Sequence, residues 1–449
     1  MSNILWQQRD LKVLWHPCTQ MHDHESLPPI PIRRGRGVWI EDFDGHRYLD
    51  AISSWWTNLF GHAHPRIVEA VQAQAAELEH VLLAGFAHAP AIELAETLVS
   101  MTPESLRRVF FADNGSAAIE VALKMSFHYW QNVGETSRRR FVALSNSYHG
   151  ETLGALSVTD VPLYRRTYAP LLLEPLFAPS PDAWNAEPGE SAENCALRRL
   201  DDMRALLEAH SGEVCAVIVE PLVQCAGGMR MYHPAYLKGL RRLCDEHRLH
   251  LIADEIAVGF GRTGSMFACE QAGIAADFLC LSKGLTGGWL PLAAVLTTET
   301  VYQAFYAEHA AGKAFLHSHS YTGNPLACTA ANATLGLLRD TPVLAENVDR
   351  AHAMRTAVAS IEDHPHVAEI RQSGMILAIE LVADRATRAP FPAAERRGRR
   401  VYAHALSRGT LLRPLGDVVY FMPPYVIDEE EIAYMAAAAI ESIHVATDD

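Results

Sequence analysis

The sequence predicts an α/β protein with a large doubly wound domain, built on a mainly parallel sheet, and a smaller α+β domain. Between about residue 67 and residue 335, short apolar runs of strand length alternate with helical patterns. Polar residues follow several of these runs directly, as they do where buried parallel strands open into loops. After about residue 336 the pattern changes to that of a smaller unit. We therefore divide the chain into an N-terminal segment, a large domain and a C-terminal small domain, at 1–66, 67–335 and 336–449.

Size, charge and cysteine content narrow the class of protein. The chain has 449 residues, of which 49% are apolar, and a net charge of −15 that is spread along its length. Nucleic-acid binding is not expected, because it requires a basic face. No apolar run approaches the 18 or so residues of a membrane span, and no signal peptide is visible. The eight cysteines show no C-x-x-C spacing, so we expect reduced thiols and a cytoplasmic protein.

The N-terminal region predicts a hairpin followed by a helix. Residues 38–50 alternate in polarity around Asp44-Gly45, a dipeptide that favours a tight hairpin turn. Pro65 then opens an amphipathic helix whose apolar stripe is Ile67, Val68, Val71, Ala75 and Leu78.

Strand candidates of the large domain share short runs of buried-type residues. They are residues 109–112, 141–144, 216–219 and 249–253. Residues 178–194 carry three prolines and several acids, which is typical of a surface loop.

The loop Asp113-Asn114-Gly115-Ser116 lies between a predicted strand and a helix with an apolar stripe. Free backbone N–H groups and the positive end of the helix dipole suit a phosphate at this position. An ordinary helix N-cap explains the loop on its own. The phosphate site becomes the better interpretation because Asp254 and Lys283, which also suit a phosphate-bearing cofactor, lie downstream in the sequence.

Asp254 and Lys283 each follow a short apolar run, so both are expected at one edge of the sheet. A lysine amine can form a Schiff base with the aldehyde of pyridoxal phosphate (PLP). An aspartate can keep the pyridine nitrogen protonated, which makes the ring an electron sink. The pair predicts PLP-dependent chemistry on amino groups.

Two nearby loops offer further candidates. Tyr148 follows the strand 141–144 and either stacks on a flat cofactor ring or is a half-buried loop aromatic. His149 is predicted to be structural, because Lys283 already supplies a mobile proton carrier. Gly259 to Gly264 matches G-x-G-x-x-G, but no periodic helix follows, so a tight loop carrying Arg262 is favoured over a nicotinamide site.

Three other features allow more than one interpretation. Adjacent Trp55 and Trp56 cannot both enter one core face of a strand, so at least one is expected to line a pocket or interface. Glu220 ends a strand on the same edge as Asp254, as a supporting group or as a polar strand terminus. The His-x-His spacings 22/24, 62/64 and 317/319 have no acidic or thiol partner at ligand spacing, so no metal site is predicted.

With these residues together, the chain resembles the class III (ornithine-type) PLP aminotransferases along nearly its whole length. The stretches that carry the resemblance are residues 53–56, 88–94, 227–234, 253–264, 321–328, 412–416 and 422–425. The resemblance implies the type I fold of PLP-dependent transferases and a dimer with shared active sites.

The resemblance also implies roles for single residues. Lys283 would carry the cofactor, Asp254 would pair with the pyridinium, and Tyr148 would stack on the ring and touch substrate. Gly115 and Ser116 would bind the cofactor phosphate of their own subunit. His319 and Ser320 would reach the cofactor phosphate of the neighbouring subunit.

Substrate contacts follow from the same resemblance. Arg413 would bind the carboxylate of a keto acceptor, Trp55 and Trp56 would enclose its aliphatic chain, and Arg262 would assist the amino donor. Relatives commonly have tyrosine where this chain has Cys18, and Gly-Pro-Thr where it has Ser318-His319-Ser320. The substrate contact of Ser318 is implied only by its position.

Several functions remain open from the sequence. The first is ping-pong transamination with S-adenosylmethionine, or lysine, as the amino donor. The second is an aminotransferase for an ω-amino acid or a diamine. A nicotinamide oxidoreductase and a non-catalytic binding protein are the remaining alternatives.

Overall fold

A computed structural model describes residues 2–448 of the chain, which divide into two compact units. The larger unit comprises residues 66–346. The smaller unit combines the described residues 2–65 and 347–448. The smaller unit is thus assembled from both ends of the chain. None of the helices in residues 2–448 has the length and apolar composition required to cross a membrane.

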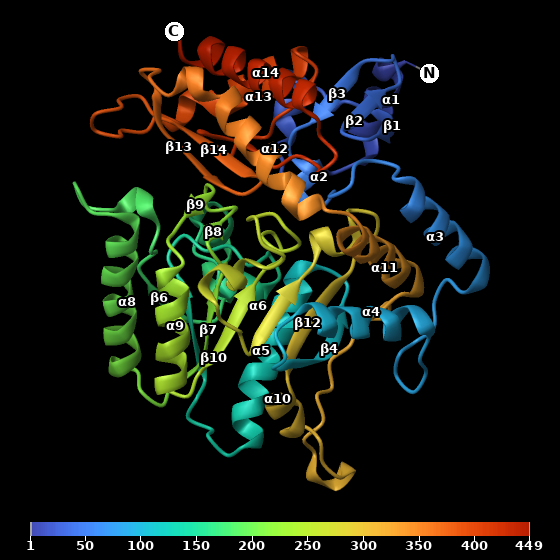
Figure 1. Cartoon of the computed structure of the whole chain (residues 1–449), viewed down its shortest axis with the longest axis vertical. Coiled ribbons are helices and arrows are strands. Elements are labelled where there is room, and N and C mark those ends of the chain that lie inside the picture. Colours follow the sequence, from blue (N-terminus) through green and yellow to red (C-terminus); the bar gives the residue numbers. More distant parts are fainter. Residues whose placement is uncertain (1, 449) are drawn as a thin grey trace. The chain divides into compact units, whose positions relative to one another are not determined.

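The larger unit is built on a seven-stranded sheet with the order β4-β12-β11-β10-β7-β5-β6, of which Figure 1 labels β4, β12, β10, β7 and β6. Strand β12 is antiparallel to both neighbours, whereas the pairs from β11 to β6 are all parallel. The strands are β4 (Leu106–Ala112), β5 (Arg140–Leu144), β6 (Leu176–Ala178), β7 (Val214–Val219), β10 (His250–Asp254), β11 (Phe278–Leu281) and β12 (Ala293–Thr298). The predicted mainly parallel sheet is confirmed, and the predicted strands lie within these bounds, except that Leu249 precedes β10.

Alternate residues of the central strands are buried on both faces of this sheet. Ile218 and Ile252 pack with α5 (Gly115–Asn132) in the main core, while Val217 and Leu251, which point the other way, are equally inaccessible. The other helices of this unit are α3 (Pro65–Glu77), α4 (Ala89–Met101), α6 (Leu153–Ser157), α7 (Pro162–Arg165), α8 (Ala192–Ala209), α9 (Ala235–Glu246), α10 (Glu299–Gln303) and α11 (Pro325–Asp340). A two-stranded ribbon pairs β8 (Val223–Gln224) with β9 (Arg230–Met231).

The smaller unit contains two short sheets. One has the order β1-β2-β3-β15, from β1 (Ile32–Arg36), β2 (Trp39–Asp42), β3 (Arg47–Asp50) and β15 (Thr410–Leu411). The other joins β13 (Val367–Ser373), β14 (Ile376–Leu381) and β16 (Val418–Phe421). Its helices are α1 (Asn3–Val13), α12 (Val343–Ala357, entered from the larger unit), α13 (Arg397–Ser407) and α14 (Glu429–Thr447). The short segment α2 (Ser53–Trp56) is a single turn with positive φ values.

Local sequence signals explain several of these elements. The hairpin predicted around Asp44-Gly45 is confirmed as β2 paired with β3, and Gly45 has a φ of 91° that favours glycine. Asn114 caps α5 by accepting the N–H of Ala117, and Asp428 forms a capping box with Glu431 at α14. The predicted helix after Pro65 is α3.

Candidate active site

Asp254 and Lys283 lie at the same edge of the large sheet. Asp254 is the last residue of β10 and pairs in register with Cys280 of β11, and Lys283 follows β11 after one intervening residue. Burial lowers the pKa of the Lys283 ammonium, while Asp254, Cys225 and Glu220 act in the opposite direction. Lys283 also has a φ of 44°, a backbone conformation that is unfavourable for residues with a Cβ. The structure thus places a half-buried lysine and a buried carboxylate at the ends of adjacent parallel strands.

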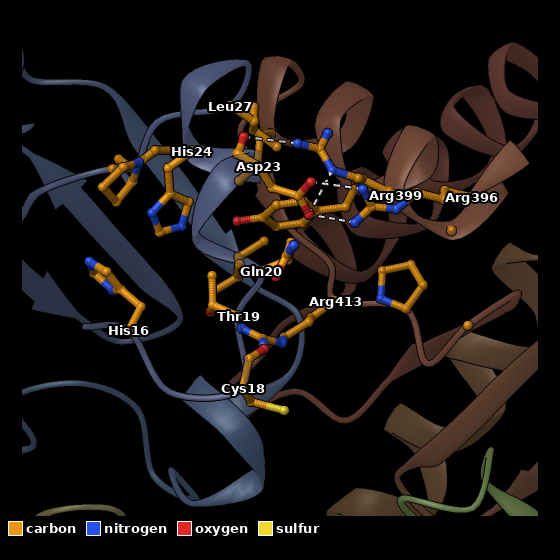
Figure 2. A pocket seen from close by; sticks show the side chains of 18 of the residues that line it. His16, Cys18, Thr19, Gln20, Asp23, His24, Leu27, Arg396, Arg399 and Arg413 are labelled. Atoms are coloured by element: carbon orange, nitrogen blue, oxygen red, sulfur yellow. Dashed lines mark hydrogen bonds and ion pairs between the residues drawn. The ribbon is translucent and has the colours of Figure 1, made fainter. Parts of the chain in front are cut away.

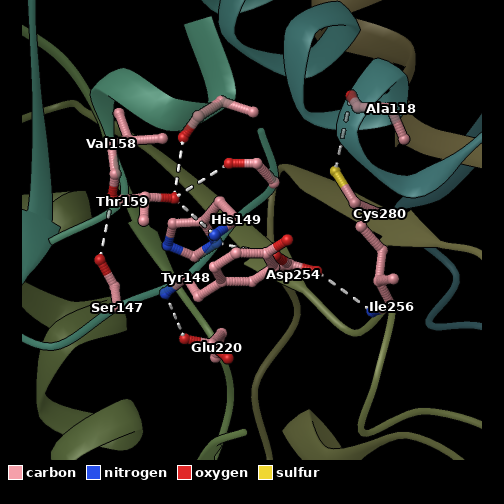
Figure 3. A network of polar contacts seen from close by, with 12 residues as sticks. Ala118, Ser147, Tyr148, His149, Val158, Thr159, Glu220, Asp254, Ile256 and Cys280 are labelled. Atoms are coloured by element: carbon pink, nitrogen blue, oxygen red, sulfur yellow. Dashed lines mark hydrogen bonds and ion pairs between the residues drawn. The ribbon is translucent and has the colours of Figure 1, made fainter. Parts of the chain in front are cut away.

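His149 contacts Asp254 directly (Figure 3). Its Nδ1 lies 2.7 Å from Asp254 Oδ2, and both side chains are buried. A carboxylate only accepts, so the ring proton is on Nδ1. The other oxygen, Oδ1, accepts the N–H of Ile256 at 3.1 Å. His149 therefore orients Asp254, a role that the sequence analysis did not assign.

Glu220 ties two loops of the site together. One carboxyl oxygen accepts the N–H of Tyr148 at 2.9 Å, and the other accepts the N–H of Cys225 at 3.0 Å. Burial, reinforced by Asp254, raises the pKa of Glu220 to about 8. The Tyr148 hydroxyl donates to Glu151 at 2.9 Å, and its ring meets Tyr164 edge-on. Glu220 is therefore a supporting group that holds the backbone of Tyr148.

The start of α5 forms a cradle for an anion. The first N–H groups of a helix have no partner within the helix, and at α5 these belong to Gly115 and Ser116. The Ser116 hydroxyl lies 2.7 Å from that of Thr152. The loop bearing Tyr148 and His149 comes so close that a Cβ on Gly150 would lie 2.4 Å from Ser116 Oγ. Gly150 therefore permits contact between the cradle and the Tyr148 loop.

The other predicted residues of the larger unit lie in two loops, one with Arg262 and one with residues 318–320. The Arg262 side chain is almost fully buried, in a loop followed only by the short 3-10 helix Ala268–Ala272. This loop opens no long helix, which agrees with the prediction against a dinucleotide fingerprint. His319 Nδ1 lies 3.9 Å from Asp113 Oδ2, beside the cradle of its own chain, whereas Ser318 and Ser320 are exposed.

In the smaller unit, Arg413 and Trp55 form a stacked pair. The guanidinium carbon of Arg413 lies 4.5 Å from the centre of the Trp55 ring, and one Arg413 nitrogen donates to the carbonyl of Cys18 at 3.4 Å. Trp56 points elsewhere, since it is 4% exposed against 39% for Trp55 and donates from Nε1 to the Tyr420 hydroxyl. The two tryptophans thus have different roles, one in the core and one beside a cation.

Arg413 and Cys18 line a cavity of about 900 Å³ within the smaller unit (Figure 2). Asp23 pairs there with Arg396 and Arg399, whereas Arg413 has no carboxylate partner among residues 2–448. Much of the remaining wall is apolar and includes Leu27, Pro28, Pro29, Ile30 and Phe391. Such a cavity suits a ligand with a carboxylate and an aliphatic chain.

All eight cysteines are free, and Cys18 alone is exposed, while the other seven are buried. In the described part of the chain, only His364, His444 and Asp448 bring metal-ligating atoms within 4.8 Å of one another. This group belongs to the smaller unit, and His364 Nδ1 already accepts the N–H of His366 at 3.2 Å. None of the three residues is a predicted site residue.

The residues of the larger unit fit PLP. A lysine amine with a lowered pKa suits attack on an aldehyde, and a carboxylate fixed by His149 suits a pyridinium nitrogen. The cradle at α5 suits a phosphate, and Tyr148 offers an aromatic face.

Comparison with known proteins gives a consistent result. The family model described as aminotransferase class-III matches residues 20–443. The adenosylmethionine-8-amino-7-oxononanoate aminotransferase of Helicobacter pylori is 47% identical over 437 residues, which cover 96% of each chain. The Geobacter sulfurreducens protein of the same name is 43% identical, with 98% and 97% covered.

Solved structures agree with the sequence relatives. The adenosylmethionine-8-amino-7-oxononanoate aminotransferase of Methanocaldococcus jannaschii superposes with a TM-score of 0.93 at 37% identity, covering 98% of this chain and 99% of its own. An omega transaminase of Pseudomonas jessenii in complex with PMP gives a TM-score of 0.94 at 30% identity, with 98% of each chain covered.

Proposed function

The chain belongs to the class III aminotransferases, and on that basis we propose that it transfers the amino group of S-adenosylmethionine to 8-amino-7-oxononanoate. The product is 7,8-diaminononanoate, an intermediate of biotin biosynthesis. The observation that carries this proposal is identity of 41–47% over nearly the whole chain to relatives named for this reaction. Arg413, which lies beside Trp55 and has no carboxylate partner in the described part of the chain, supports it, because the acceptor has a carboxylate on an aliphatic chain.

The cofactor of this family is PLP, which when bound supplies an electron sink for the charge that develops at the amino-bearing carbon. Asp254 holds the proton on the pyridine nitrogen, and His149 holds Asp254 in place. Lys283 Nζ takes and returns the proton at the substrate carbon, a task for which burial prepares it by lowering its pKa. Gly115 and Ser116 bind the phosphate, and Tyr148 stacks on the ring.

The remaining residues divide between donor, acceptor and partner. Arg413 binds the acceptor carboxylate, Trp55 flanks its chain, and Arg262 assists the donor, whereas Trp56, which the resemblance also implied for this wall, packs in the core. His319 and Ser320 reach the phosphate of a neighbouring subunit, with Ser318 near substrate, so the enzyme acts as a homodimer. We place it in the cytoplasm, because its eight cysteines are free thiols, as is usual in a reducing compartment.

A second candidate is an aminotransferase for an ω-amino acid or a diamine. It is favoured by the TM-score of 0.94 to an omega transaminase, although the 30% identity of that structure is lower than that of the sequence relatives. Lysine as the donor to the same acceptor is a variant of the first proposal.

Amino-donor profiling separates these functions. Purified enzyme is supplied with 8-amino-7-oxononanoate and either S-adenosylmethionine, lysine, an ω-amino acid or a diamine, and 7,8-diaminononanoate is measured by mass spectrometry. We expect product with S-adenosylmethionine. Product with lysine alone would show that lysine is the amino donor. Turnover only of ω-amines with other acceptors would refute the proposal.

A further inference from the structure

The turn that carries the two tryptophans is left-handed. Ser53, Ser54, Trp55 and Trp56 have φ values of 52°, 46°, 74° and 73°, and none of them is glycine. Left-handed conformations are unfavourable for residues with a Cβ and normally occur singly. Four in succession persist only if the surrounding structure holds them, and such strain is concentrated at functional sites.

Asp50 is the group that holds this turn. Its carboxylate is completely buried, and one oxygen accepts the N–H of Ser54 at 2.9 Å. The other oxygen accepts the Ser54 hydroxyl at 2.7 Å and lies 3.0 Å from His62 Nε2. The same residue is therefore bonded to the backbone and the side chain of the second residue in the turn.

The handedness of the turn decides where each tryptophan points. Ser53 Oγ donates to the carbonyl of Met422 at 2.8 Å, and Trp56 Nε1 donates to Tyr420 at 2.9 Å, so this side of the turn is fixed to the core. Trp55 is left on the other side, with its ring over the guanidinium of Arg413. Stacking restricts the guanidinium and leaves its N–H edge for a carboxylate.

We propose that Asp50 is a positioning residue for acceptor recognition, because it maintains the left-handed turn that sets Trp55 against Arg413. This inference rests on the proposed function and extends it to a residue that does not touch the acceptor. A preorganised cation binds its ligand more tightly than a mobile one, since less freedom is lost on binding. Affinity for an aliphatic carboxylate therefore depends on Asp50, whereas reaction with the amino donor does not.

The test compares Asp50→Asn and Ser54→Ala with a matched control. Asn cannot accept all the bonds of the carboxylate, and Ala removes only the Ser54 hydroxyl. The control is Asp42→Asn, since Asp42 is 1% exposed and accepts N–H groups of Asp44 and His46, but holds the neighbouring hairpin instead. Thermal unfolding of each holoenzyme shows which variants keep the fold. If Asp50→Asn does not fold, Ser54→Ala provides the test.

Two readouts separate recognition from general damage. The first is binding of nonanoate, an aliphatic carboxylate that cannot be transaminated, followed by tryptophan fluorescence. The second compares the half-saturating concentration of 8-amino-7-oxononanoate with the rate of the donor half-reaction. We expect Asp50→Asn to raise both the nonanoate Kd and the acceptor KM about tenfold, with the donor half-reaction within about twofold of wild type. Ser54→Ala changes them in the same direction by less, and Asp42→Asn leaves them unchanged.

A double variant tests the left-handed turn itself. Glycine adopts positive φ at no steric cost, so Ser54→Gly in the Asp50→Asn background should restore part of the nonanoate affinity. Unchanged nonanoate and acceptor affinity in folded Asp50→Asn, or equal loss in Asp42→Asn, would overturn the inference. A wild type that binds nonanoate but does not convert 8-amino-7-oxononanoate would refute the proposed function, and the nonanoate series would still decide the role of Asp50.

Discussion

His149 Nδ1 lies 2.7 Å from Asp254 Oδ2 in the interior of the larger unit, so an imidazole fixes the carboxylate predicted to face the cofactor nitrogen. Among residues 2–448, His149 Nε2 is buried and has no hydrogen-bond partner. The cost of burying this histidine is offset mainly through its single bond to Asp254.

Replacement of His149 should therefore lower turnover without removing the cofactor lysine. We expect His149→Ala to reduce kcat about ten- to hundredfold, since small displacements of catalytic groups are costly. His149→Asn retains a donor and should recover part of the loss. Steady-state kinetics together with the visible spectrum of bound PLP provide the measurement, and wild-type kcat in folded His149→Ala would contradict the role.

Removal of the Lys283 amine should abolish both turnover and covalent capture of the cofactor. Borohydride reduction followed by peptide mass spectrometry should locate the cofactor on Lys283 in the wild type and nowhere in Lys283→Ala. Capture at another lysine of the variant would show that the assignment is wrong.

Loss of Arg413 should weaken the acceptor selectively. We expect Arg413→Ala to cost about 1.5–3 kcal/mol of acceptor binding, the usual scale for a hydrogen bond to a charged group. Arg408→Ala is a suitable control, because Arg408 pairs with Glu441 on the surface at 3.0 Å. Equal acceptor affinity in Arg413→Ala and wild type would remove its proposed role.

Glu220 should make stability depend on pH. Its pKa of about 8 in the fold exceeds its ordinary value of 4.5, so between these values the folded state keeps a proton that the unfolded chain has released. The stabilising contribution is complete below about pH 4.5 and is lost as pH rises through about 8. We expect the unfolding temperature of Glu220→Gln minus that of the wild type to increase between pH 5 and pH 8, because only the wild type loses this contribution. A difference that is independent of pH would contradict the raised pKa.

The positions of Asp254 and Lys283 were predictable because both follow apolar runs whose length and composition specify buried parallel strands. Glu220 was recognisable for the same reason, as a polar residue at a strand end. The contact of His149 with Asp254 was not predictable, since it joins residues 105 positions apart through a loop. The different environments of Trp55 and Trp56 were not predictable either. They depend on a left-handed turn, which is not expected of four consecutive residues without glycine.

The distribution of thiols offers a practical consequence. Seven cysteines are shielded in the interior, and the accessible one, Cys18, presents its carbonyl to Arg413. A maleimide dye should therefore attach at a single natural position, without mutagenesis, at the wall of the cavity in the smaller unit. Its emission would follow the arrival of a ligand at that wall in real time.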